Sequence, residues 1–92
     1  MKVNTIPLVA EFLGTLLLVL SVLASGGSAW FIGITYAVII LFTNKTSGGH
    51  INPAVSLGMY VKGRLSMNEL IGYSVSQLLG AVTSVYVFKA LA

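Results

Sequence analysis

The sequence predicts an all-α membrane protein with three transmembrane helices and one re-entrant half-helix. Three observations support this fold class. Only 8% of the 92 residues are Asp, Glu, Lys or Arg, whereas a soluble domain devotes about 25% of its residues to these four types. Long runs without any charge cover most of the chain. Between two of these runs lies an uncharged stretch that glycines and a proline interrupt.

The first two spans come from one charge-free run of 33 residues, 12–44. Because about 20 apolar residues cross a bilayer, this run is too long for one helix. The sequence Ser-Gly-Gly-Ser at 25–28 supplies a turn that divides it, which predicts spans at about residues 6–24 and 28–46. A basic start before an apolar run is also typical of a signal peptide, but this run is longer than a usual signal core and contains Glu11.

The third span is predicted at about residues 68–90, because the charge-free run 70–88 lies between Glu69 and Lys89. With three spans, four basic residues share one side of the membrane and Lys89 lies alone on the other. Since basic residues are retained on the cytoplasmic side, the N-terminus is predicted to be cytoplasmic. The four residues that share this side are Lys2, Lys45, Lys62 and Arg64.

Residues 47–61 are predicted to form a re-entrant loop and half-helix. Only 52–61 has a helical pattern, and ten residues at about 1.5 Å each span about 15 Å, half the hydrocarbon thickness. Irregular backbone is tolerated at membrane depth only where protein buries it or where it lines an aqueous cavity. We therefore expect this segment to enter and leave on the cytoplasmic side, which keeps Lys45 and Lys62 together.

Asn52 and Pro53 are the strongest helix start in the chain. Asn is a favoured N-cap residue, and Pro fits the first helical position because its missing N–H has no partner there. The amide NH₂ of Asn52 is then a fixed donor at the positive end of the helix dipole. Gly48 and Gly49 allow the preceding backbone to turn its carbonyls toward the same space. The result is a column of carbonyl acceptors that leads to one donor, and such a column passes water, repels cations and interrupts a proton wire. The alternative is that Asn52 and Pro53 begin an ordinary surface helix.

This loop resembles the first signature loop of the aquaporin (major intrinsic protein) family, in residues 47–56 (Ser-Gly-Gly-His-Ile-Asn-Pro-Ala-Val-Ser). Residues 10–15 are similar to the first-helix signature of that family, and residues 72–81 to its third helix. The resemblance implies that residues 1–92 form a single aquaporin-like half, the N-terminal one of two inverted repeats. The second Asn-Pro-Ala loop and the arginine that follows it are absent from these 92 residues.

The resemblance also implies pore-lining roles. Asn52, within the Asn-Pro-Ala motif that Pro53 and Ala54 complete, would be a donor at the pore centre, with Val55 as an apolar wall. Ile32 falls at a filter position where relatives carry Phe, His or Trp, although a shift of one residue would place Phe31 there. Main-chain carbonyls would be offered to water by Gly48, Gly49, His50 and Ile51.

Two polar side chains inside the spans are predicted to support the loop. Glu11 is expected to accept hydrogen bonds from its backbone, the alternative being a carboxylate near the interface. Gln77 is expected to bond either across helices or to the loop. His50 is interpreted as a packed, hydrogen-bonded group rather than a metal ligand. Small residues four apart predict close helix packing, namely Gly72, Ser76, Gly80 and Ser84; interface or packing aromatics are Trp30, Tyr36 and Tyr60.

Together these observations predict a passive, cofactor-free water channel without enzymatic activity, metal or nucleic-acid partner. The alternatives are a facilitator for glycerol or a similar neutral solute, and a non-conducting membrane subunit or truncated remnant. One repeat cannot enclose a pore, because two half-helices must meet from opposite sides of the membrane. We therefore expect a complementary second repeat, and the chain is either part of a longer product or a free half. Family resemblance further implies a homo-oligomer, a tetramer, in the lipid bilayer.

Overall fold

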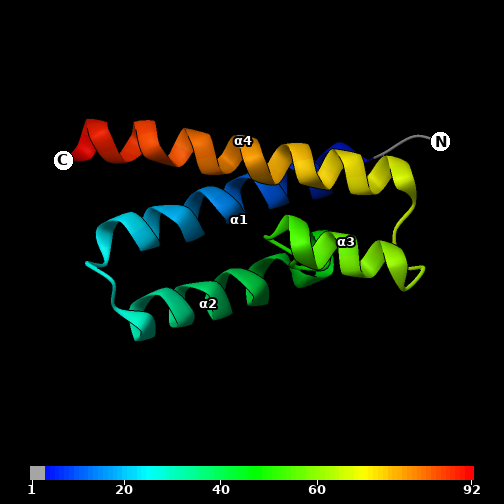
Figure 1. The fold of residues 1–92 in the computed structure, drawn as a ribbon, viewed down its shortest axis with the longest axis horizontal. Coiled ribbons are helices and arrows are strands. Elements are labelled where there is room, and N and C mark those ends of the chain that lie inside the picture. The colour runs from blue at the N-terminus through cyan, green and yellow to red at the C-terminus, as the bar shows by residue number, and fades with distance from the viewer. Residues whose placement is uncertain (1–3) are drawn as a thin grey trace.

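The computed structural model describes residues 4–92 and forms four helices within them (Figure 1). Three of these are long and apolar enough to cross a membrane, and the fourth, α3, is a short helix. The predicted fold class is therefore confirmed. Lys2, which contributes to the predicted charge bias, lies outside the described residues. In chain order the helices are α1 (Thr5–Ala24), α2 (Ala29–Ser47), α3 (Pro53–Val61) and α4 (Met67–Leu91).

The three long helices run along the long axis of the molecule, and α1 packs against both α4 and α2 (Figure 1). The molecule is 41 Å long, which matches the roughly 40–45 Å thickness of a bilayer with its headgroup regions. The short helix α3 packs against α4. It begins near the middle of the long axis and ends where the chain turns into α4 (Figure 1), so that it covers only part of the membrane thickness.

Local turn and capping chemistry sets the helix ends. Gly26 and Gly27 adopt positive φ angles of 63° and 88° between α1 and α2, a conformation that glycine adopts at little cost. Ser28 then caps α2 by accepting a hydrogen bond from a first-turn N–H. At α4, Ser66 and Glu69 form a reciprocal capping box. The polar residues between the apolar runs therefore define where each span stops and the next begins.

The contact between α1 and α4 depends on Gly80. A Cβ atom at Gly80 would overlap the carbonyl oxygen of Phe12, so the two backbones approach closely only because position 80 lacks a side chain. Of the predicted small-residue stripe, Gly80 and Ser84 are buried as expected, whereas Gly72 and Ser76 are only half-buried. The remaining buried positions of α4 are Tyr73 and Gln77, because the N-terminal half of α4 contributes polar side chains to the cluster described below.

Candidate functional site

The site is organised around the start of α3. Asn52 caps this helix, its Oδ1 accepting a hydrogen bond from the N–H of Ala54 at 2.8 Å, and Pro53 occupies the first helical position. The predicted helix start is therefore confirmed. Asn52 is exposed in the single chain, as is Val55 one turn later. With Oδ1 engaged, the amide NH₂ of Asn52 is the donor that this exposed position presents.

Glu11 connects α1 to the loop that precedes α3. Its side chain has no exposed surface, and its carboxylate accepts four hydrogen bonds. Oε1 accepts from the N–H of Ile51 and from Nε2 of Gln77, each at 2.7 Å. Oε2 accepts from the hydroxyl of Ser47 at 2.5 Å and from the N–H of His50 at 3.2 Å. These bonds satisfy backbone donors that the irregular loop otherwise leaves unpaired inside the membrane.

Ile51 is fixed to α1 through its backbone and its side chain. It has a φ of 59°, the one positive φ at a non-glycine residue in the described chain, and such strain costs about 1–3 kcal/mol. Its carbonyl accepts a hydrogen bond from the hydroxyl of Thr15 at 3.3 Å. Its side chain, 1% exposed, fills a space that a Cβ atom at Gly14 would occupy. One face of α1, formed by Glu11, Gly14 and Thr15, therefore stabilises the strained residue before Asn52.

A second group of contacts attaches the loop and α3 to α4. The hydroxyl of Ser56 lies 2.8 Å from Nδ1 of His50 and accepts a hydrogen bond from Nε2 of Gln77 at 2.9 Å. The hydroxyl of Tyr73 donates to the carbonyl of Ser47 at 2.7 Å, and its ring centroid lies 5.0 Å from that of His50. Gln77 therefore bonds across helices, to Glu11 of α1 and to Ser56 of α3.

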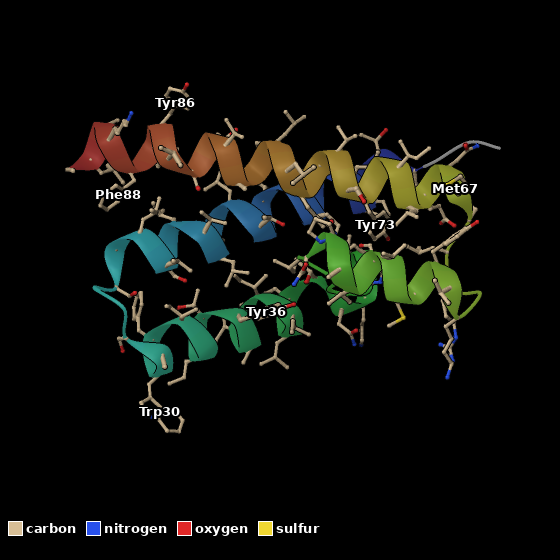
Figure 2. The ribbon with its side chains drawn as sticks, viewed as in Figure 1. Trp30, Tyr36, Met67, Tyr73, Tyr86 and Phe88 are labelled. Carbon is tan, nitrogen blue, oxygen red and sulfur yellow. The ribbon has the colours of Figure 1, made fainter. Side chains whose placement is uncertain are left out.

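Tyr36 contacts the loop from α2. Its hydroxyl donates a hydrogen bond to the carbonyl of His50 at 2.9 Å. Figure 2 shows the side chain between α2 and the N-terminal end of α3. Tyr36 was interpreted as an interface or packing aromatic, and in addition its hydroxyl engages one of the carbonyls predicted to meet water. That carbonyl retains a second lone pair.

The predicted site residues divide into two groups by burial. Gly49, His50 and Ile51 of the loop are buried, as are Glu11 of α1 and Gln77 of α4. The remaining residues are exposed or half-buried in the single chain: Gly48, Asn52, Pro53, Ala54, Val55 and Ile32. Ile32 lies near the N-terminal end of α2, one turn before Tyr36. The roles of these residues in a pore stay predictions.

Sequence reasoning assigned no functional role to five residues that the structure places in this site. They share a hydroxyl group that bonds to the loop, to Glu11 or to Gln77: Thr15, Tyr36, Ser47, Ser56 and Tyr73. A spacing of four residues was the available signal, because it places Thr15 on the helix face of Glu11 and Tyr73 on the face of Gln77. Polar residues repeated on one face of an apolar helix indicate buried partners.

These features define an integral membrane protein in which a buried carboxylate supports a short helix and its preceding loop between membrane-length helices. The chain belongs to the major intrinsic protein family, whose sequence profile matches residues 3–92. Members of this family are channels rather than enzymes, in agreement with the absence of covalent chemistry predicted from the sequence.

Curated relatives agree with this assignment. The chain is 38% identical to "Aquaporin Z" of Brucella melitensis, with 90% of this chain and 42% of the relative covered. It is 34% identical to "Aquaporin PIP2-7" of Arabidopsis thaliana, covering 90% and 35%. It is 37% identical to "Lens fiber major intrinsic protein" of Gallus gallus, covering 82% and 33%. The chain thus spans about a third to two fifths of the length of these relatives. No solved structure matches it significantly.

Proposed function

We propose that this chain forms one half of a passive transmembrane channel for water. The observation that carries the proposal is the exposed amide of Asn52 at the N-terminus of a half-length helix. An unpaired polar group facing lipid is unfavourable, whereas the same group facing an aqueous path is satisfied by water. Two of the three relatives named above are called aquaporins, which supports the same solute.

The proposed mechanism uses positioning and electrostatics without covalent chemistry. Water donates to the carbonyls of the loop and accepts from the NH₂ of Asn52, so that its orientation is fixed where the column of acceptors meets the donor. The positive end of the α3 dipole disfavours a cation at this point. A water held by a rigid donor interrupts the hydrogen-bonded wire that protons need. Glu11 does not enter the path, because its carboxylate is buried and bonded to four protein donors.

A complementary repeat is part of this proposal. Asn52, Ala54 and Val55 are exposed in the single chain, and an inverted second repeat that covers them closes the pore. The second repeat belongs to the same polypeptide or to another one. With the N-terminus on the cytoplasmic side, α3 enters from that side and its partner enters from the opposite side. Crosslinking is expected to detect no antiparallel homodimer, since the basic residues favour one orientation.

Glycerol or a similar neutral solute is the second candidate. Ile32, half-buried on α2, has an aliphatic side chain where the resemblance places the filter. Such a side chain offers no hydrogen bond to orient water, and it contacts the carbon skeleton of a polyol favourably. Comparing water and glycerol permeabilities in the same vesicles distinguishes the two candidates.

Asn52→Asp tests the proposal. Asp is as good an N-cap as Asn, so the helix start is kept while the NH₂ donor is removed and a negative charge is added. We expect osmotic water flux in proteoliposomes containing the chain and its second repeat to fall at least about tenfold, equivalent to about 1.4 kcal/mol in the barrier. The matched control is Asn44→Asp, an exposed position in α2. Unchanged flux in Asn52→Asp, or native flux equal to that of protein-free liposomes, refutes the proposal.

A further inference from the structure

The hydroxyl of Tyr36 occupies one of the carbonyls that the proposed channel offers to water. This hydroxyl lies 2.9 Å from the carbonyl oxygen of His50, two residues before Asn52. The other side chains that bond to the backbone of the loop belong to buried residues, namely Glu11, Thr15, Ser47 and Tyr73. Tyr36 reaches the loop from α2 and is itself only half-buried. Its ring is therefore on the side of the loop that the proposed path follows.

The neighbours of Tyr36 on α2 place it along this path. Ile32 and Ile40 lie four residues before and after it, on the same face of the helix. At the far end of this face, Ile40 packs on the loop, since its Cγ2 lies 3.2 Å from where a Cβ atom of Gly49 would be. At a rise of about 1.5 Å per residue, Ile32 and Tyr36 are about 6 Å apart along the axis. The α2 face thus passes from the predicted filter position, through Tyr36, to the loop.

We infer that Tyr36 is a specificity-determining residue that narrows the path between Ile32 and Asn52 and admits water in preference to larger polar solutes. This inference rests on the proposed function. The aromatic ring takes space that a polyol needs. The hydroxyl uses one lone pair of the His50 carbonyl, while its own oxygen gives a passing water a replacement acceptor. A solute with several hydroxyl groups therefore finds fewer free carbonyls and a narrower path than it would without Tyr36.

Permeability measurements on two variants distinguish the effect of the Tyr36 ring from that of its hydroxyl. Tyr36→Val removes the ring, and we expect the glycerol-to-water permeability ratio in proteoliposomes with the second repeat to rise about tenfold or more. Tyr36→Phe removes only the hydroxyl, and we expect water permeability to change by no more than about fivefold, the rate equivalent of one neutral hydrogen bond. Leu41→Val is the matched control, because Leu41 is 80% exposed on the opposite face of α2. An unchanged permeability ratio in Tyr36→Val overturns the inference.

Cysteine labelling gives a readout that does not require flux. The sequence contains no cysteine, so Tyr36→Cys and Leu41→Cys each introduce a single thiol. We expect a small water-soluble thiol reagent to modify position 36 about tenfold faster or more, because thiolate formation needs water. If the native protein conducts and position 36 reacts no faster than position 41, the inference fails and the proposed function stands. If the native protein does not conduct, the proposed function fails, and the labelling ratio alone supports or overturns the placement of Tyr36.

Discussion

Glu11→Gln replaces one carboxylate oxygen with an amide nitrogen while nearly preserving the shape of the side chain. If the remaining oxygen faces Ile51 and Gln77, the new NH₂ faces the N–H of His50 and the hydroxyl of Ser47. That hydroxyl can rotate and accept, but the His50 N–H loses its acceptor, which costs about 1–3 kcal/mol for a buried donor. The bonds to Ile51 and Gln77 lose charge assistance, about 1 kcal/mol each.

The sum is a loss of about 3–5 kcal/mol for the closed loop, in which the loop backbone is bonded to residue 11, relative to the open loop, in which these bonds are broken. At 1.4 kcal/mol per factor of ten, the equilibrium shifts toward the open loop by about 100- to 4,000-fold. The cost of burying the carboxylate does not cancel this loss. Glu11 belongs to α1 (Thr5–Ala24), which spans the membrane whether the loop is closed or open, so its desolvation is similar in both states.

Amide hydrogen exchange in lipid nanodiscs measures this change directly. We expect the amides of His50 and Ile51 to exchange at least about 100-fold faster in Glu11→Gln, since exchange reports the opening equilibrium. Glu69→Gln is the matched control, because Glu69 accepts its hydrogen bond at the start of α4 and not from the loop. Exchange at His50 and Ile51 within about threefold of the native rate, with α1 still protected, refutes the reasoning.

Two pairs of glycine substitutions test packing, each followed by denaturant unfolding in detergent. Gly80→Ala is expected to destabilise the protein by about 1–3 kcal/mol through the overlap with Phe12, whereas Gly33→Ala, with open space around it, gains up to about 1 kcal/mol of helix propensity; equal effects contradict this account. Gly49→Ala is expected to cost more than Gly26→Ala, because both have φ near 65° but only Gly49 has close neighbours; equal losses would show that packing at the loop is unimportant.

The fold was predictable because the membrane imposes simple requirements on the sequence. The run 12–44 must contain two helices on length alone, and the Ser-Gly-Gly-Ser turn is the one place where it can divide. The register of α4 was less predictable. Small residues indicated where helices approach closely, and Gly80 lies at such a contact, but the buried positions Tyr73 and Gln77 depend on partners supplied by α1 and the loop.

The site was predictable where its interactions are local in sequence. The cap of Asn52 on Ala54 joins residues two apart, so the dipeptide at 52–53 specifies it. The contacts between Tyr36 and His50 and between Ser56 and Gln77 join residues 14 and 21 apart, and no local pattern indicates which hydroxyl meets which partner.

The conformation of Ile51 opposes its own sequence preference. A β-branched residue strongly disfavours positive φ, so the sequence alone predicts extended backbone at this position. The observed φ of 59° is imposed by two hydrogen bonds and by the space left at Gly14: the N–H of Ile51 donates to Glu11, and its carbonyl accepts from Thr15. Strain of this kind persists only where the surrounding structure over-determines the conformation, and here it orients the backbone that leads into Asn52.

The polar groups on the two sides of the loop differ in how many hydrogen-bond partners the chain gives them. On the buried side, Glu11 accepts four hydrogen bonds and Thr15 and Tyr73 donate to loop carbonyls. On the outer side, Asn52 is exposed although the helix that it caps begins near the middle of the molecule's long axis (Figure 1). Because polar groups at membrane depth require partners, this exposure supports the proposal that water and a facing repeat supply the partners of Asn52. The asymmetry itself therefore argues for an aqueous path along Asn52.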